Sequence, residues 1–135
     1  IKKFNKKNYN FPNFISKSAN LMKNNIIGKG NIILPNSIIQ SSSKIKNYNV
    51  IGTGSIILHN SNISSNCIIG GGVSIGAGTK IGKNVFIGVG STIASNTTSK
   101  NIEIGNYAFV CSGSVVLSSI SSKSKVIGNP ARKIL

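Results

Sequence analysis

The sequence predicts an all-β fold, a parallel β-helix in which short strands stack into triangular coils. The first observation is a period of six: an aliphatic residue occupies every sixth position fourteen times in succession, from Ile15 to Ile93. The second is that a small or narrow side chain follows four positions later in most of these units. Neither an α-helix nor an isolated strand repeats every six residues. The two offsets together therefore define a structural repeat.

Each six-residue unit fits a short strand followed by a sharp corner. The first and fifth residues of the unit point inward, and the corner residues point outward. Three units close one triangle of eighteen residues, and successive triangles stack at about 4.8 Å, the spacing of hydrogen-bonded strands. Corners such as "GKGN", "GAGT" and "GVGS" supply glycine, which accepts tight bends. We therefore expect five to six coils between Ile15 and Leu117, with the isoleucines in one continuous core.

The repeat is interrupted once. Ser99 stands where an aliphatic residue is due, and the pattern resumes five residues late at Ile104. Extra residues in a stack of repeats bulge outward as a loop, and such loops often carry function. The predicted organisation is a linker or capping strand over residues 1–14, the β-helix over 15–120 with a loop insertion near 95–103, and a C-terminal tail over 121–135.

The charge balance of the chain is strongly basic. Its 135 residues contain 16 Lys and Arg against one acidic residue, a net charge of +15. Such a charge attracts polyanions, so it is compatible with nucleic-acid binding or with a multiply phosphorylated small molecule. A codon bias toward Lys, Asn and Ile explains it as well, since Asn and Ile are over-used to the same degree. The sequence has no aromatic platform for stacking bases, so we expect no nucleic-acid partner.

Cysteine usage and hydropathy narrow the class of protein. Cys67 and Cys111 form no CxxC pair and no metal-ligand spacing, so we expect neither a disulfide framework nor a metal site. No apolar run approaches the roughly 20 residues needed to cross a bilayer. The N-terminus also lacks the hydrophobic region of a signal peptide. We expect a cytoplasmic protein with no membrane partner.

Three stretches carry a family resemblance: "GTGSIILHN", "IGKNVFIGVGSTI" and the terminal "VIGNPARKI". With them the chain resembles the hexapeptide acyltransferases, and most of all the branch of sialic-acid O-acetyltransferases and N-acetyltransferases of nucleotide-linked 4-amino sugars. The resemblance implies a left-handed coil, whereas general crossover rules favour the right hand. It also implies a homotrimer with acetyl-CoA in a groove between neighbouring prisms. In this branch a Rossmann-like domain precedes the helix; we expect the given sequence to lack it, and "FPNFISKSA" resembles the junction after it.

His59 is the only histidine, and the repeat assigns it a position. The inward residues of its unit are Ile57 and Ser61, so His59 points outward near a corner. One interpretation is a solvated surface histidine; the other is a general base that takes a proton from an attacking amine or hydroxyl. Adding eighteen residues places Ala77 beside His59 on the next coil and Ser95 one coil further.

The resemblance implies roles for several of these residues. In the resembling enzymes a backbone N–H one coil after the histidine binds the thioester oxygen, which here is Ala77 N–H; the alternative is an ordinary ladder amide. The same alignment places Ile68, Val89, Ser95 and Ser112 at acetyl-CoA.

Two departures from the family pattern bear on activity. Family members usually follow the histidine with Asp or Glu, whereas this chain has Asn60. An amide can orient the imidazole but offers no charge to stabilise imidazolium, so we expect a weaker base. Gly52 stands where the amino-sugar enzymes tend to have Asn.

We expect neither cysteine to act as a nucleophile. We also expect Glu103, in the inserted loop, to be able to reach a site on an adjacent subunit.

The expected function is that of an acetyl-CoA-dependent acetyltransferase. Its acceptor is an amino or hydroxyl group of a sugar or nucleotide-linked sugar in surface-glycan biosynthesis, and acetyl-CoA is the co-substrate. His59, oriented by Asn60, deprotonates the acceptor for direct transfer without a covalent enzyme intermediate. The alternatives are a non-catalytic structural β-helix and a polyanion-binding module. The sequence indicates neither the acceptor sugar nor the choice between nitrogen and oxygen.

Overall fold

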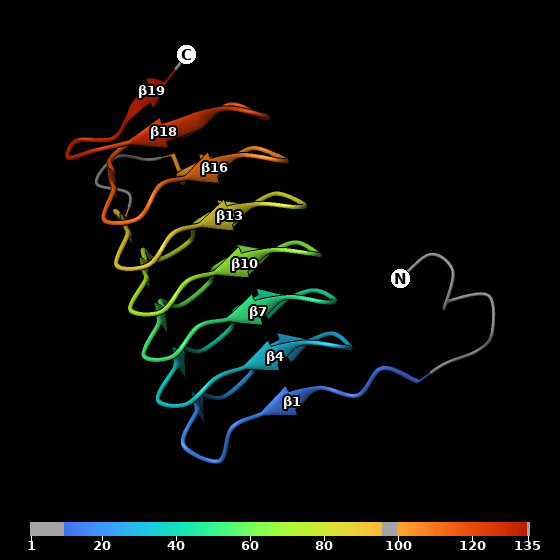
Figure 1. Cartoon of the computed structure of the whole chain (residues 1–135). Coiled ribbons are helices and arrows are strands. Elements are labelled where there is room, and N and C mark those ends of the chain that lie inside the picture. The colour runs from blue at the N-terminus through green and yellow to red at the C-terminus, as the bar shows by residue number, and fades with distance from the viewer. Residues whose placement is uncertain (1–9, 96–99, 135) are drawn as a thin grey trace.

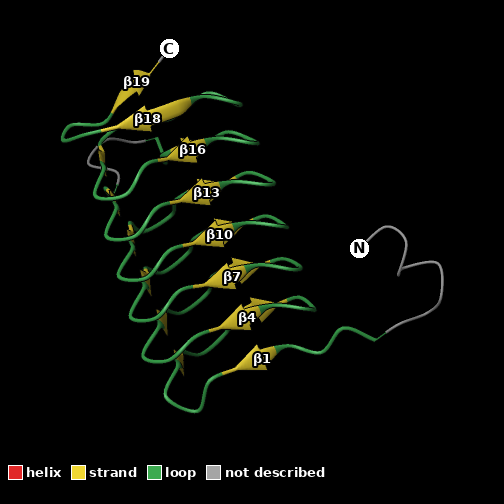
Figure 2. Cartoon of the chain, in the orientation of Figure 1, coloured by secondary structure: helices red, strands yellow, loops and turns green. Residues whose placement is uncertain are grey.

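The computed structural model describes residues 10–95 and 100–134, and its architecture is a parallel β-solenoid (Figure 1). The labelled strands of one face lie one above another from the N-terminal to the C-terminal end. Figure 2 shows short strands on the faces, joined by loops at the corners, and no helix in the described part of the chain. The predicted all-β fold class is confirmed, with about six coils.

Three sheets form the faces of the prism. Sheet A contains β1 (Phe14–Ile15), β4 (Ile32–Ile33), β7 (Val50–Ile51), β10 (Ile68–Ile69), β13 (Phe86–Ile87), β16 (Phe109–Val110), β18 (Lys125–Ile127) and β19 (Arg132–Ile134). Sheet B contains β2 (Asn20–Leu21), β5 (Ile38–Ile39), β8 (Ile56–Ile57), β11 (Ser74–Ile75), β14 (Thr92–Ile93) and β17 (Val115–Val116). Sheet C contains β3 (Ile26–Ile27), β6 (Lys44–Ile45), β9 (Asn62–Ile63), β12 (Lys80–Ile81) and β15 (Glu103–Ile104).

The register of the sheets follows the eighteen-residue coil. Ile51 pairs in parallel with Ile69 on the next coil, and the same offset of eighteen holds on all three faces up to the insertion. In the last coil the offset is 16, as between Val110 and Val126. Across the insertion the offset becomes 23 residues, as between Lys80 and Glu103, and the stacking then continues. Residues 96–99 of the expected loop lie outside the described residues, as do residues 1–9 of the expected linker.

The core consists of the inward isoleucines. Twelve of them, from Ile33 to Ile104, are almost completely buried. Burial of one such side chain contributes about 1.5–3 kcal/mol to folding, so this column is the main stabilising element. Ile15 in the first coil is 41% exposed, because a terminal coil has a neighbour on one side alone. The β-branched composition suits these pleated two-residue strands.

A second inward column is polar in the first coils. Asn31 and Asn49 are fully buried. The backbone N–H of Asn49 donates to Asn31 Oδ1 at 2.9 Å, and that of Asn31 donates to Asn13 Oδ1 at 2.8 Å. The column ends at Cys67, whose N–H donates to Asn49 Oδ1 at 2.8 Å. These bonds satisfy buried amides that would otherwise be costly.

The C-terminal residues, expected as a tail, continue the solenoid. β18 adds to sheet A in parallel, and β19 folds back on it as an antiparallel strand, with Val126 opposite Lys133. In the described part of the chain, no helix has the length and hydropathy that crossing a membrane requires.

A candidate active site at the corner between two sheets

His59 and Asn60 form the corner between β8 on sheet B and β9 on sheet C. Both side chains are exposed, as their predicted outward position requires. Asn60 has a φ of 59°, in the left-handed region that asparagine tolerates. The sharp bend that follows from this φ projects the imidazole from the edge of the prism rather than from a flat face.

The Asn60 amide contacts the His59 ring, with Nδ2 at 3.1 Å from Nδ1. When Nδ2 donates, Nδ1 is the acceptor and the neutral imidazole carries its proton on Nε2. When the amide turns over, Oδ1 accepts from Nδ1–H, and Nε2 presents a lone pair to solvent. Proton abstraction by Nε2 therefore requires the second arrangement, which the same pair of side chains can adopt.

Ala77 and Ser95 lie on the two coils that follow His59 along the same edge. The N–H of Gly78 donates to the carbonyl oxygen of His59 at 2.9 Å, which joins the first two corners. The N–H of Ala77 donates to Ser95 Oγ at 3.1 Å. Its partner is thus a side-chain hydroxyl and not a backbone carbonyl, so rotation of the Ser95 side chain leaves this amide available to a ligand.

The remaining predicted contacts lie elsewhere on the prism. Val89 and Ser112 are exposed at the corner between sheets A and B, joined by a bond from Gly113 N–H to the Val89 carbonyl oxygen at 2.8 Å. Ile68 is 48% exposed on the outer face of sheet A. The structure therefore brings His59, Ala77 and Ser95 together but separates them from these residues, because sheet B lies between the two corners.

The outer face of sheet A is an apolar column that sequence reasoning missed. Its members stack in register one coil apart: Phe14, Ile32, Val50, Ile68, Phe86 and Phe109. The rings of Phe86 and Phe109 are stacked with centroids 4.5 Å apart. Lys125 continues the column and places its ammonium 5.1 Å from the Phe109 ring centroid. The signal was available, since each residue immediately precedes an inward aliphatic of sheet A.

The outer face of sheet C is polar after its first member, the exposed Ile26, and sequence reasoning missed this column too. Lys44, Asn62, Lys80 and Glu103 follow one another in register. Lys80 Nζ pairs with Glu103 Oε1 at 2.9 Å, and both side chains are exposed. Glu103 therefore lies in a strand and binds a lysine of its own chain. A hollow of about 290 Å³, here called the sheet C hollow, lies beside this column and is bordered by Lys44, Asn60, Asn62, Gly78 and Lys80.

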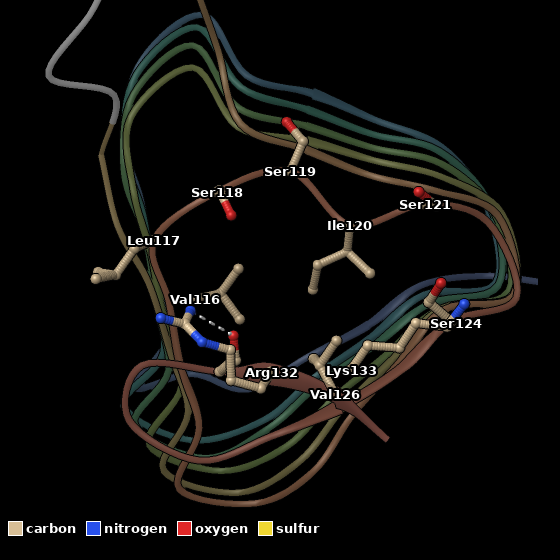
Figure 3. A pocket seen from close by; sticks show the side chains of 11 residues that line it. Val116, Leu117, Ser118, Ser119, Ile120, Ser121, Ser124, Val126, Arg132 and Lys133 are labelled. Atoms are coloured by element: carbon tan, nitrogen blue, oxygen red, sulfur yellow. Dashed lines mark hydrogen bonds between the residues drawn. The ribbon is translucent and has the colours of Figure 1, made fainter. Parts of the chain in front are cut away.

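Another hollow, of about 260 Å³, lies at the C-terminal end of the prism (Figure 3). Val116, Ile120 and Val126 point into it, and Arg132 and Lys133 lie at its border. It is three coils from the His59 corner. It therefore offers no group that could act together with the imidazole.

The two cysteines do not contribute to the corner site. Cys67 is fully buried, and burial raises the pKa of its thiol, which disfavours the reactive thiolate. Its Sγ lies 3.0 Å from the carbonyl oxygen of Gly82 inside the prism. Cys111 is half-buried on sheet A, just after the inward Val110.

Close packing between coils explains the glycine at position 52. A Cβ on Gly52 would collide with the carbonyl carbon of Gly70 and with the nitrogen of Gly71. Contacts this short require the backbone of the next coil to shift. An asparagine at this position, as in the resembling enzymes, is therefore incompatible with the local coil spacing of this chain.

Comparison with known proteins agrees with this architecture. The family model for the bacterial transferase hexapeptide (six repeats) matches residues 60–95, which include Asn60, Ala77 and Ser95. No curated protein matches the sequence. Solved structures resemble the chain over nearly its whole length, although the sequence identity is low.

Three of these structures are acyltransferases. PerB from Caulobacter crescentus, in complex with CoA and GDP-perosamine, is 24% identical with a TM-score of 0.93, over 98% of this chain and 62% of that chain. The acetyltransferase domain of PglB from Neisseria gonorrhoeae, in complex with acetyl coenzyme A, is 22% identical with a TM-score of 0.92, over 98% and 62%. AntD from Bacillus cereus, an N-acyltransferase in complex with dTDP and 3-hydroxybutyryl-CoA, is 20% identical with a TM-score of 0.80, over 99% and 87%.

These similarities establish the fold. The three proteins are left-handed β-helices, and a superposition of this quality requires the same hand of coil. The predicted left-handed β-helix is thus confirmed. The chain spans about 62% of the length of the first two structures.

Proposed function

We propose that this chain is the catalytic β-helix of an acetyl-CoA-dependent acetyltransferase in surface-glycan biosynthesis, acting in the cytoplasm on an amino or hydroxyl group of a nucleotide-linked sugar. The observation that carries the proposal is the edge formed by His59, Ala77 and Ser95. There an exposed imidazole lies one coil from an amide that donates to no backbone carbonyl. Complexes of PerB with GDP-perosamine and of PglB with acetyl coenzyme A support this donor and acceptor class, and they favour an amine as the acceptor.

The corner residues divide the chemistry between them. His59 Nε2 takes a proton from the acceptor amine while the nitrogen lone pair attacks the thioester carbonyl carbon. Asn60 Oδ1 holds Nδ1–H and so keeps Nε2 directed at the acceptor. Ala77 N–H, released by Ser95, donates to the oxyanion of the tetrahedral intermediate, which is worth a few kcal/mol of barrier. The imidazolium returns its proton to the departing CoA sulfur, and no covalent bond to the protein forms.

A homotrimer completes this site. One chain presents the His59 corner and the Ile68, Val89 and Ser112 positions on different sides of sheet B, so an acyl donor that touches both sets must lie between two copies. The apolar outer column of sheet A supports such packing, because it is the large uncharged surface of a chain with a net charge of +15. On sheet B, the outward-facing and half-buried Ile38 and Ile56 add apolar surface for packing against the neighbouring copy.

The decisive experiment measures CoA release from acetyl-CoA with GDP-perosamine and other nucleotide-linked 4-amino sugars. We expect the His59→Ala variant to lose about a hundredfold or more in kcat, because a positioned general base contributes that much. The Asn60→Asp variant should gain activity, because a carboxylate stabilises the imidazolium. Equal turnover by the wild type and His59→Ala would eliminate the role of the imidazole.

A non-catalytic β-helix is distinguished by binding rather than by turnover. Acetyl-CoA at a hundredfold excess over its Kd should stabilise a binding protein by about 2.7 kcal/mol, seen as a rise in Tm. A structural scaffold would show no such rise. The similarity to acyltransferases does not favour this alternative or the polyanion-binding module.

A further inference from the structure

We propose that Gln40 is a positioning residue for the general base. Its side-chain amide holds the backbone of His59 from the preceding coil and so fixes the direction of the imidazole: the N–H of His59 donates to Gln40 Oε1 at 3.2 Å. Gln40 is half-buried, whereas His59 is exposed. This inference rests on the proposed function and adds to it a residue that acts through His59 rather than on the reacting atoms.

Gln40 differs from the other residues of its column. The residue after each inward aliphatic of sheet B begins the corner, and hydrogen bonds between coils stack these residues. The members of this column are Met22, Gln40, Leu58, Gly76 and Ala94. Four of them have an apolar side chain or none, and Gln40 is the only glutamine of the chain. The one side-chain amide of the column therefore lies on the coil that precedes the only histidine.

The peptide group between Leu58 and His59 is held at both ends by side chains. Its carbonyl oxygen accepts from Ser61 Oγ at 2.7 Å and from Ser43 Oγ at 3.2 Å. Its N–H donates to Gln40 Oε1. A peptide group is planar, so its two ends turn together. Bonds at both ends oppose that rotation, which would also turn the Cα–Cβ bond of His59.

The other contacts of His59 are of a different kind. Its carbonyl oxygen accepts from Gly78 N–H at 2.9 Å, and the next N–H, of Asn60, donates to the carbonyl oxygen of Ser41 at 3.2 Å. These two bonds join backbone to backbone and do not depend on the side chains. The ring is held at Nδ1 by the Asn60 side chain. Gln40 thus supplies the contact to the His59 backbone that a single substitution can remove.

The expected size of the effect follows from how strongly catalysis depends on placement. A displacement of about 1 Å at a catalytic group can cost about a hundredfold in rate. Loss of one bond to an exposed corner frees the imidazole for part of the time, so we expect a loss of about tenfold in kcat. The KM for acetyl-CoA should not change, because Ala77 and Ser95 lie on the coils after His59 and Gln40 lies on the coil before it.

The test measures acetyl transfer by Gln40→Met, which removes the acceptor at nearly constant length and introduces the residue found at the equivalent position one coil earlier. We expect about tenfold lower kcat, an unchanged KM for acetyl-CoA and faster hydrogen exchange of the His59 amide. Gln40→Glu keeps an acceptor oxygen at the same reach and should restore kcat to within about twofold of the wild type. Gln40→Asn is one methylene shorter and should behave as Gln40→Met does.

Ser65→Ala is the matched control. Ser65 Oγ accepts from the N–H of Asn47 at 3.2 Å, so it covers a corner amide in the same way, at the corner between sheets C and A. This variant should lower Tm about as much as Gln40→Met does and leave kcat unchanged. Equal losses of kcat in both variants would overturn the inference, because Gln40 would then act through stability alone.

A double-mutant cycle tests whether Gln40 acts through the imidazole. In the His59→Ala background, Gln40→Met should cause no further loss of kcat, and a further tenfold loss would overturn the inference. The ¹⁵N shifts of the imidazole need no turnover. If Gln40→Met alters them although the wild type transfers no acetyl group, the orientation of His59 by Gln40 is upheld and the proposed function fails. If the wild type transfers acetyl and Gln40→Met matches its kcat, the proposed function stands and this inference fails.

Discussion

The outer faces of sheets A and C have opposite chemistry, although the same six-residue repeat builds both. Inside the prism the two sheets present the same residue, as Ile51 and Ile63 illustrate, and both are fully buried. Outside, sheet A carries a column of aliphatic and aromatic side chains, and sheet C, after Ile26 in its first coil, carries lysine, asparagine and glutamate. The comparison shows that the inward positions of a coil determine the fold, and that its outward positions are left to determine what each face contacts.

The largest expected effect on stability comes from truncating the inward isoleucines, which are alike on sheets A and C. Ile51→Ala on sheet A and Ile63→Ala on sheet C should each lower the free energy of unfolding by about 2–5 kcal/mol, because each leaves a cavity in a dry core. Urea unfolding at one protein concentration measures both. Thr92→Ala, an exposed outward position on sheet B, is the control and should change stability by less than about 0.5 kcal/mol. If only one of the two isoleucine variants lost this much unfolding free energy, the inner faces of sheets A and C would not be equivalent.

A smaller effect on stability, but a complete effect on assembly, is expected from a charge on the apolar face. Ile68→Asp places a carboxylate in the middle of the sheet A column, where burial against a second copy would strip it of water. We expect light scattering on a sizing column to give the mass of the proposed trimer for the wild type and the mass of a monomer for this variant. Asn62→Asp on sheet C should leave the mass unchanged, and dissociation of both variants would assign the interface to another surface.

The smallest expected effect concerns the ion pair on sheet C. Glu103→Gln removes the partner of Lys80, yet both side chains are more than half exposed, so the loss should not exceed about 1 kcal/mol. Thermal unfolding at low and high salt measures it, and the difference from the wild type should shrink as salt screens the pair. A loss that exceeds this bound and persists in high salt would mean that the pair is a structural element of the face.

The backbone and the stacking of the corner were accessible from the sequence. The period of six places each inward isoleucine, and the resumption of the period at Ile104 locates the insertion. Adding eighteen residues to His59 gives Ala77 and Ser95, and hydrogen bonds between these coils confirm the stacking. This succeeds because inward and corner positions follow from backbone geometry that every coil repeats.

The details that decide chemistry were not accessible in this way. The contact of Asn60 with His59 and the bond from Ala77 N–H to Ser95 Oγ depend on side-chain torsions that no period specifies. β19 was missed because an antiparallel pairing outside the repeat leaves no periodic signal. The outward column of sheet C, in contrast, was within reach: adding eighteen to Lys44 gives Asn62 and then Lys80, and the offset of 23 gives Glu103.

The antiparallel strand β19 affects whether further strands can add to the end of sheet A. A solenoid of near-identical rungs ends in an unpaired strand edge, on which another molecule could polymerise into a fibre. Here the last strand of sheet A runs against the direction of all the others, and it exposes Arg132 and Lys133 beside that edge. A further coil with parallel strands would face a strand that runs in the opposite direction and carries positive charge, in a chain that is itself positively charged. Sheet A therefore ends, in the described residues, in an antiparallel and positively charged strand, which disfavours the addition of a further parallel strand at this edge.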